Sequence, residues 1–130
     1  MTEAMHCSCG REIPIAAAWT GLTLNKPLRC SRCGAMQTRE TLLPLIDDDA
    51  ADDRVRAALI AWLQIERYGW VSSSTIANMA ILDAKKVGSV LAGLVRSGLL
   101  QRAEGKPSAA AAIADPHPIF VPGPTHPVPA

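Results

Sequence analysis

Apolar residues recur at helical spacing between residues 51 and 68. The repeating positions are Val55, Ala58, Leu59, Trp62 and Ile65. Apolar positions three and four residues apart share one face of a helix, so this stretch predicts an amphipathic helix that buries that face. Gly69 follows directly and is placed to end the helix, because glycine readily adopts the left-handed conformation of a helix terminus.

A cluster of three serines at residues 72–74 precedes a second apolar pattern. A serine hydroxyl at an N-cap accepts a hydrogen bond from a backbone N–H of the first helical turn. The apolar residues Ile76, Ala77 and Ala80 follow the cluster. The pattern therefore predicts a short helix that ends at a tight link, Ile81-Leu82.

A third helix is predicted to begin at Asp83, which is placed to cap it. Its inward positions are Val87, Val90, Leu91, Leu94 and Val95. Gly98 fits the residue just beyond the helix end, and residues 99–102 read as a short strand. Residues 104–107, Glu-Gly-Lys-Pro, read as the tip of a hairpin.

The two ends of the chain differ from this helical part. In the first part, strands are expected near residues 12–24 and 35–45, with a turn at Asn25-Lys26-Pro27. From Ser108 onward the composition shifts to alanine and then to proline, which predicts an extended or disordered tail over residues 108–130.

All four cysteines lie in the first 33 residues, as the pairs Cys7/Cys9 and Cys30/Cys33, each followed by glycine. Two close pairs of thiolates are what a tetrahedral zinc site needs, and the glycines allow tight turns around the sulfur atoms. Twenty residues separate the pairs. The second pair has the usual spacer of two residues and the first has only one, so the match to a zinc ribbon is good but imperfect. The sequence predicts a Zn²⁺ site formed by Cys7, Cys9, Cys30 and Cys33.

The four cysteines allow other interpretations. Two disulfides are disfavoured because residues 1–15 do not read as a secretory leader. A redox pair is disfavoured because no strand–helix context surrounds Cys30 and Cys33. His6 remains an alternative ligand, since the Cys7–Cys9 spacing is tight for two thiolates on one metal.

Composition and residue placement argue against an enzyme and against a membrane-spanning protein. The net charge is +1, but residues 71–107 carry an excess of three positive charges. The three histidines, His6, His117 and His126, are scattered, and four thiolates would leave no open position on zinc, so an enzyme is not expected. No apolar run is long enough to span a membrane, and a cytoplasmic protein without a small-molecule substrate is expected.

The stretch from Ile76 through Asp83 to Leu94 and Gly98-Leu99-Leu100 resembles a winged helix-turn-helix. The resemblance covers residues 52–107. It implies a recognition helix that enters the DNA major groove, with base contacts from its N-terminal part. The outward positions of that helix are Ala84, Lys85, Lys86, Gly88, Ser89 and Ala92.

The nucleic-acid contacts that this resemblance implies come from Lys85, Lys86, Ser89, Arg102 and Lys106. Lys85 and Lys86 can bind phosphate, and Ser89 can bind the nucleic-acid backbone or a base. Arg102 and Lys106 fall on the wing. The chain departs from a typical DNA reader because Gly88 and Ala92 cannot reach a base edge. The alternative interpretation of these cations is a solvated helix face.

The fold class expected from sequence is therefore α+β, with a zinc ribbon (1–46), a winged helix-turn-helix (47–107) and an Ala/Pro-rich tail (108–130). This tandem resembles small accessory subunits of transcription machinery. We expect a DNA-binding regulator or a subunit of a nucleoprotein complex; the alternative is an adaptor whose winged helix docks a partner protein. Trp62 is expected in the core, Trp70 against the helix-turn-helix, and Trp19 either exposed or packed against the second unit.

Overall fold

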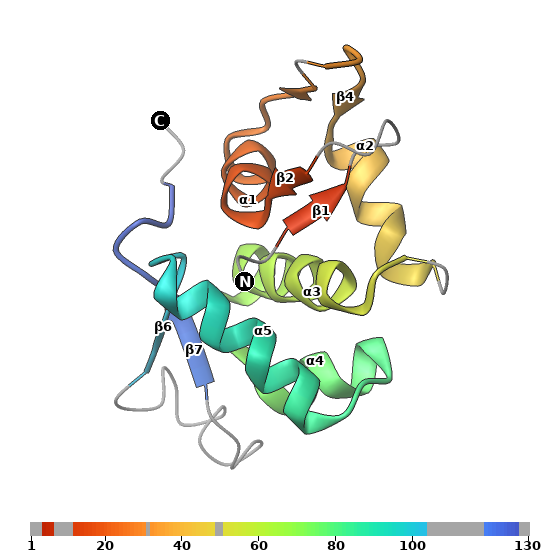
Figure 1. The fold of residues 1–130 in the computed structure, drawn as a ribbon. Coiled ribbons are helices and arrows are strands. Elements are labelled where there is room, and N and C mark those ends of the chain that lie inside the picture. Colours follow the sequence, from red (N-terminus) through yellow and green to blue (C-terminus); the bar gives the residue numbers. More distant parts are fainter. Residues whose placement is uncertain (1–3, 7–11, 31, 49–50, 104–118, 128–130) are drawn as a thin grey trace.

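The computed structural model describes residues 4–6, 12–30, 32–48, 51–103 and 119–127. Within these ranges the chain is α+β (Figure 1). The helices are α1 (Ile15–Leu24), α2 (Arg39–Leu42), the 3-10 helix η1 (Leu43–Asp47), α3 (Asp53–Tyr68), α4 (Ser73–Ala80) and α5 (Ala84–Arg96). The strands are β1 (Ala4–His6), β2 (Glu12–Pro14), β3 (Leu28–Arg29), β4 (Met36–Gln37), β5 (Val71–Ser72), β6 (Leu100–Arg102) and β7 (Ile119–Pro122).

The prediction of strands near residues 12–24 is wrong for most of that stretch. Only β2 is extended, and it pairs antiparallel with β1, while residues 15–24 form α1. Pro14 occupies the N-cap of α1, and the alanines that follow favour a helix. The buried positions are Ile15, Ala18, Trp19, Leu22 and Thr23, which share one helical face. Asn25 ends the helix in the left-handed conformation, with φ of 54°.

The strand predicted near residues 35–45 is also wrong beyond β4. Thr38 and Thr41 form a capping box, in which the Thr38 backbone N–H donates to Thr41 Oγ1 over 2.8 Å. These local hydrogen bonds start α2, and Pro44 in the first turn of η1 continues the helical path. Leu42 is buried in the core, so the helical turn is fixed by packing as well.

The three helices predicted in the second half are confirmed as α3, α4 and α5. Ser72 Oγ accepts from Thr75 N–H over 3.2 Å, and Asp83 Oδ1 accepts from Lys86 N–H over 2.7 Å, so both predicted caps are present. Gly69 ends α3 with φ of 77°, and Gly98 follows the C-cap of α5 with φ of 81°. The predicted strand after Gly98 is β6.

Part of the proline-rich tail is extended, as one of the two predicted forms, but it is a central strand of a sheet rather than a loose segment. Residues 119–122 form β7, which lies between β5 and β6 in an antiparallel sheet of order β5-β7-β6. The strand is apolar throughout, with Ile119 buried, and Pro122 falls at its end, where a missing N–H is tolerated. Gly123 follows because a Cβ there would collide with the carbonyl groups of Gly98 and Leu100. The tail residues 108–118 and 128–130 lie outside the described residues.

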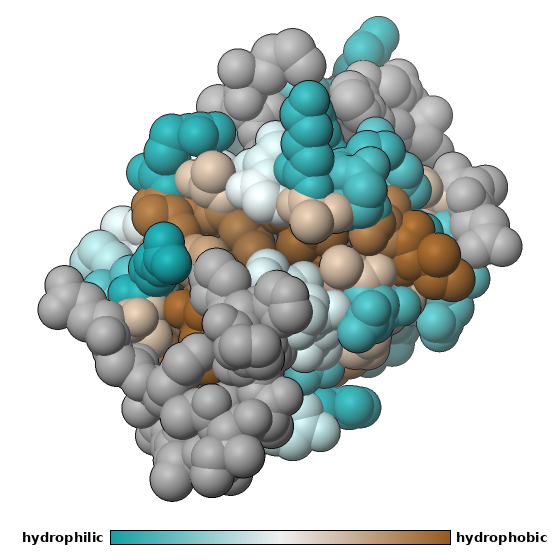
Figure 2. Space-filling view, turned by 90° about the horizontal axis from the view of Figure 1, so that it is seen from below, coloured by the Kyte–Doolittle hydropathy of each residue, from teal (hydrophilic) through white to brown (hydrophobic). Residues whose placement is uncertain are grey.

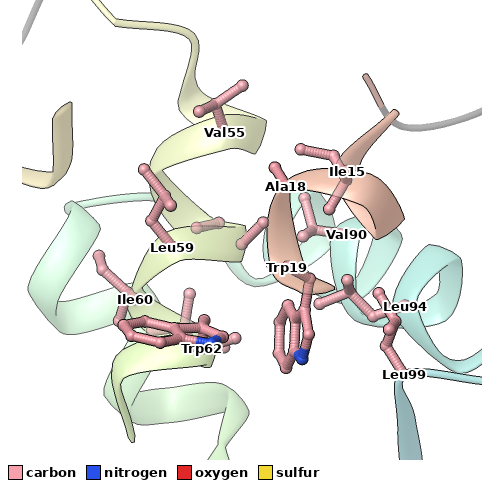
Figure 3. Close-up of a cluster of buried hydrophobic side chains, with 14 of the residues drawn as sticks. Ile15, Ala18, Trp19, Val55, Leu59, Ile60, Trp62, Val90, Leu94 and Leu99 are labelled. Atoms are coloured by element: carbon pink, nitrogen blue, oxygen red, sulfur yellow. The ribbon is translucent and has the colours of Figure 1, made fainter. Parts of the chain in front are cut away.

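One continuous core joins the N-terminal part to the helical part. In Figure 1, α3 lies between the N-terminal elements and the α4–α5 pair. Figure 3 shows Trp19 of α1 beside Trp62 of α3 at this junction. Trp62 Nε1 donates to Thr23 Oγ1 over 2.9 Å, and Thr23 Oγ1 bonds the Trp19 carbonyl over 3.0 Å. Both rings are buried, and Trp19 packs against α3. Of the two expectations for Trp19, packing against residues 47–107 is therefore confirmed.

The segment after β7 also touches the N-terminal part. Trp19 Nε1 donates a hydrogen bond to His126 Nδ1 over 2.9 Å, and the two rings meet edge to face. Thr125 anchors this segment, because its N–H bonds the Gly98 carbonyl and its Oγ1 bonds the Ser97 carbonyl. The end of α5, the segment after β7 and α1 are thus tied together.

Candidate nucleic-acid interface and metal site

The position of α5 is set by its apolar face. Val87, Val90, Leu91 and Leu94 are buried, and α5 packs against α3 and α4. The opposite side of the helix faces solvent, with Ala84, Lys85, Gly88, Ser89 and Ala92 exposed. Five of the six positions predicted to point outward are thus exposed, whereas Lys86 is half-buried. Val95, predicted to point inward, is wrong, because it is 38% exposed at the edge of the helix.

Lys85, Ser89 and Arg96 follow one another along the exposed side of α5 at helical spacing. Arg102 lies at the end of β6 and shares a groove with Arg96. Neither arginine side chain makes a hydrogen bond or ion pair with another described residue. Arg96 is not among the contacts predicted from the sequence. Its place eleven residues after Lys85, about three helical turns, is the signal that puts both side chains on one face of the helix.

Lys86 has a different environment from the other predicted contacts. Its Nζ bonds Asp53 Oδ2 over 2.9 Å, and Arg56 Nη1 lies 3.8 Å from Asp53 Oδ1. The hydrogen bond from Lys86 lowers the pKa of Asp53 and raises the pKa of Lys86. This ion pair fastens the start of α5 to the start of α3. Lys106 lies outside the described residues.

An open groove of about 800 Å³ runs between α4, α5 and the β6–β7 pair. Its lining includes Gly88, Leu91, Ala92 and Val95 of α5, Ala77 of α4 and Phe120 of β7. Hydrophobic residues form a band across the lower face of the molecule in Figure 2. No Asp or Glu lines the groove among the described residues, whereas Arg96 and Arg102 do.

Cys30 and Cys33 lie in the tight turn between β3 and β4. Cys30 N–H donates to the Ala35 carbonyl and Gly34 N–H donates to the Cys30 carbonyl, each over 2.8 Å. Gly34 has φ of 79°, a conformation that favours glycine. Cys30 is buried and Cys33 is exposed. Two thiols three residues apart on such a turn fit one half of a zinc site.

Cys7 and Cys9, the other predicted ligands, lie outside the described residues, as does the side chain of His6. In sequence, the pair falls between β1 and β2, whose last paired residues are His6 and Glu12. The residues that the structure describes contain no group of three or more potential metal ligands. The zinc site therefore stays a prediction.

Comparison with protein-family models, curated proteins and solved structures finds no match for this chain. In the described part of the chain, no helix has both the length and the hydrophobicity needed to cross a bilayer.

Proposed function

We propose that this chain binds duplex DNA through α5 and the β6–β7 pair, as a small transcriptional regulator or a subunit of a nucleoprotein complex. The observation that carries the proposal is the exposed face of α5, which is flanked by cations and whose groove has no carboxylate among the residues that the structure describes. Phosphate groups are the nucleic-acid feature that such a surface attracts.

The order of elements supports a winged helix-turn-helix. The chain runs from α3 through β5, α4 and α5 to β6 and β7, and β7 pairs with both other strands. In a winged helix the second helix of the motif enters the major groove, and the strand pair forms a wing beside it. Here α5 takes the place of that helix, and β6 and β7 take the place of the wing strands.

The side chains on this face favour contacts to the DNA backbone over contacts to bases. Lys85, Arg96 and Arg102 can reach phosphates. Gly88 and Ala92, in the middle of the helix, have no group able to bond a base edge. Binding is therefore strongly dependent on salt and weakly dependent on sequence. Lys86 acts mainly through Asp53, by holding α5 in place.

Zinc has a structural role in this proposal. One Zn²⁺ would be held by Cys7, Cys9, Cys30 and Cys33 and would join the β1–β2 turn to the β3–β4 turn. A closed site of four thiolates leaves no open coordination position for catalysis. These two turns precede and follow α1, whose Trp19 packs on α3.

The test measures binding to several duplexes at a series of salt concentrations. Lys85→Glu should weaken binding to every duplex and make the log–log salt slope shallower by about 0.9, the value for one lost phosphate contact. Lys26→Glu is the matched control, because Lys26 is exposed at the α1–β3 turn and its reversal changes the net charge equally. Equal effects of the two reversals would contradict the proposed interface.

The adaptor alternative is favoured by a specific observation, the apolar lining of the groove on the same face. If Lys85→Glu leaves DNA binding unchanged while a protein partner is lost, the adaptor is the better description.

A further inference from the structure

The groove on α5 has an apolar lining that phosphate contacts do not explain. Val95 and Phe120 contribute large apolar side chains to it, Ala77 and Ala92 contribute small ones, and the buried Leu91 lies beneath them. An apolar groove flanked by polar residues is a common feature of peptide-binding surfaces, where an amphipathic helix lays its apolar face into the groove.

Gly88 gives a second reason to expect an occupant. It is the fifth residue of the thirteen in α5, and a Cβ built there meets no atom within 4 Å. Glycine in a helix interior makes the helix less stable than alanine would, and no described residue lies so close that a Cβ atom at position 88 would collide with it. A glycine at such a position lets another backbone approach the helix closely.

Charge selects the kind of occupant. Arg96 and Arg102 line the groove without a partner among the described residues, and no carboxylate there opposes them. A segment with carboxylates beside its apolar face would pair with both arginines, whereas a basic segment would be repelled.

We propose that an acidic amphipathic helix of a partner protein docks in the groove between α4, α5 and the β6–β7 pair. Its backbone passes close to Gly88, its aliphatic side chains meet Ala92, Val95 and Phe120, and its carboxylates pair with Arg96 and Arg102. The helix covers the face assigned above to DNA, so partner and DNA exclude one another. The docking itself does not rest on the DNA proposal.

The test is a selection from displayed random peptides of about 14 residues, roughly four helical turns. The full chain is the immobilised target, and the soluble Gly88→Leu variant is the competitor. Leucine favours helix more than glycine does, and the Cβ atom that it adds meets no other atom, so this variant should fold at least as well as the parent. Circular dichroism and thermal melting check that it does.

Enriched peptides should carry aliphatic residues at helical spacing with Asp or Glu beside them. Synthetic copies should lose about tenfold or more in affinity on Gly88→Leu, and also on reversal of both Arg96 and Arg102 to glutamate. Gly88→Ala should give a smaller loss. The proposal is overturned if no peptide is enriched, if enriched peptides lack carboxylates, or if they bind the Gly88→Leu variant as well as the parent. DNA binding that falls in this variant without any enriched peptide would assign the face to nucleic acid alone.

Discussion

Removal of the Trp19 side chain should destabilise the whole described fold. Trp19 is 2% exposed and fills the junction between α1 and α3. Truncation of a buried tryptophan to alanine costs about 3–5 kcal/mol, a large share of the roughly 5–15 kcal/mol that stabilises a typical domain. With a urea m value of about 2 kcal/mol/M, the unfolding midpoint of Trp19→Ala should fall by about 2 M.

The assay follows urea unfolding by circular dichroism, which reports mainly on α3, α4 and α5, and by fluorescence of Trp62 and Trp70. Both signals report on the helical part, whereas Trp19 belongs to the N-terminal part. Because one core joins the two parts, both signals should nevertheless move to the lower midpoint. Tyr68→Ala is the control: Tyr68 is 61% exposed, so its removal should change stability by no more than about 0.5 kcal/mol. If the helical signal of Trp19→Ala kept the parent midpoint, the N-terminal part would fold separately and the reasoning would be refuted.

Two further predictions concern His126 and the metal. Burial lowers the pKa of His126 below its ordinary value of 6.5, although Glu66 opposes the shift. The stability contributed by neutral His126 is therefore complete above pH 6.5 and should be lost as the pH falls through the lower pKa of the folded state. The His126→Asn side chain keeps an acceptor for Trp19 but does not titrate. This variant should therefore lose the pH dependence of stability in urea titrations between pH 8 and 5. The purified protein should contain one zinc per chain by elemental analysis, and Cys30→Ser should lower both the zinc content and the melting temperature; a parent protein without zinc and with its thiols in disulfides would contradict the zinc assignment.

The helical half of the fold could be predicted because its signals are local. Ser72 and Asp83 lie within three residues of the N–H groups that they cap, and Gly69 ends α3 where the apolar pattern ends. The α1 helix had a readable signal too, since its buried residues recur at helical spacing. The ribbon interpretation of the cysteines instead predicts strand there, because a zinc ribbon has strands between its cysteine pairs.

What could not be predicted depends on contacts between distant residues. β7 pairs with β5 across nearly fifty residues, and its prolines suggest a loop rather than a central strand. The pair between Lys86 and Asp53 spans 33 residues, so the sequence could not separate Lys86 from Lys85. The groove arises only when β7 brings Phe120 beside α5.

The place of β7 in its sheet has a consequence for how the protein is made. Its two neighbours, β5 and β6, are synthesised first and do not pair with each other, so the sheet stays open until residues 119–122 leave the ribosome. Until then, the apolar residues Val71 and Leu100 lack their neighbouring strand, and open strand edges invite association with other chains. A chain truncated at residue 107 would keep all five α-helices and remain in that open state, prone to aggregation.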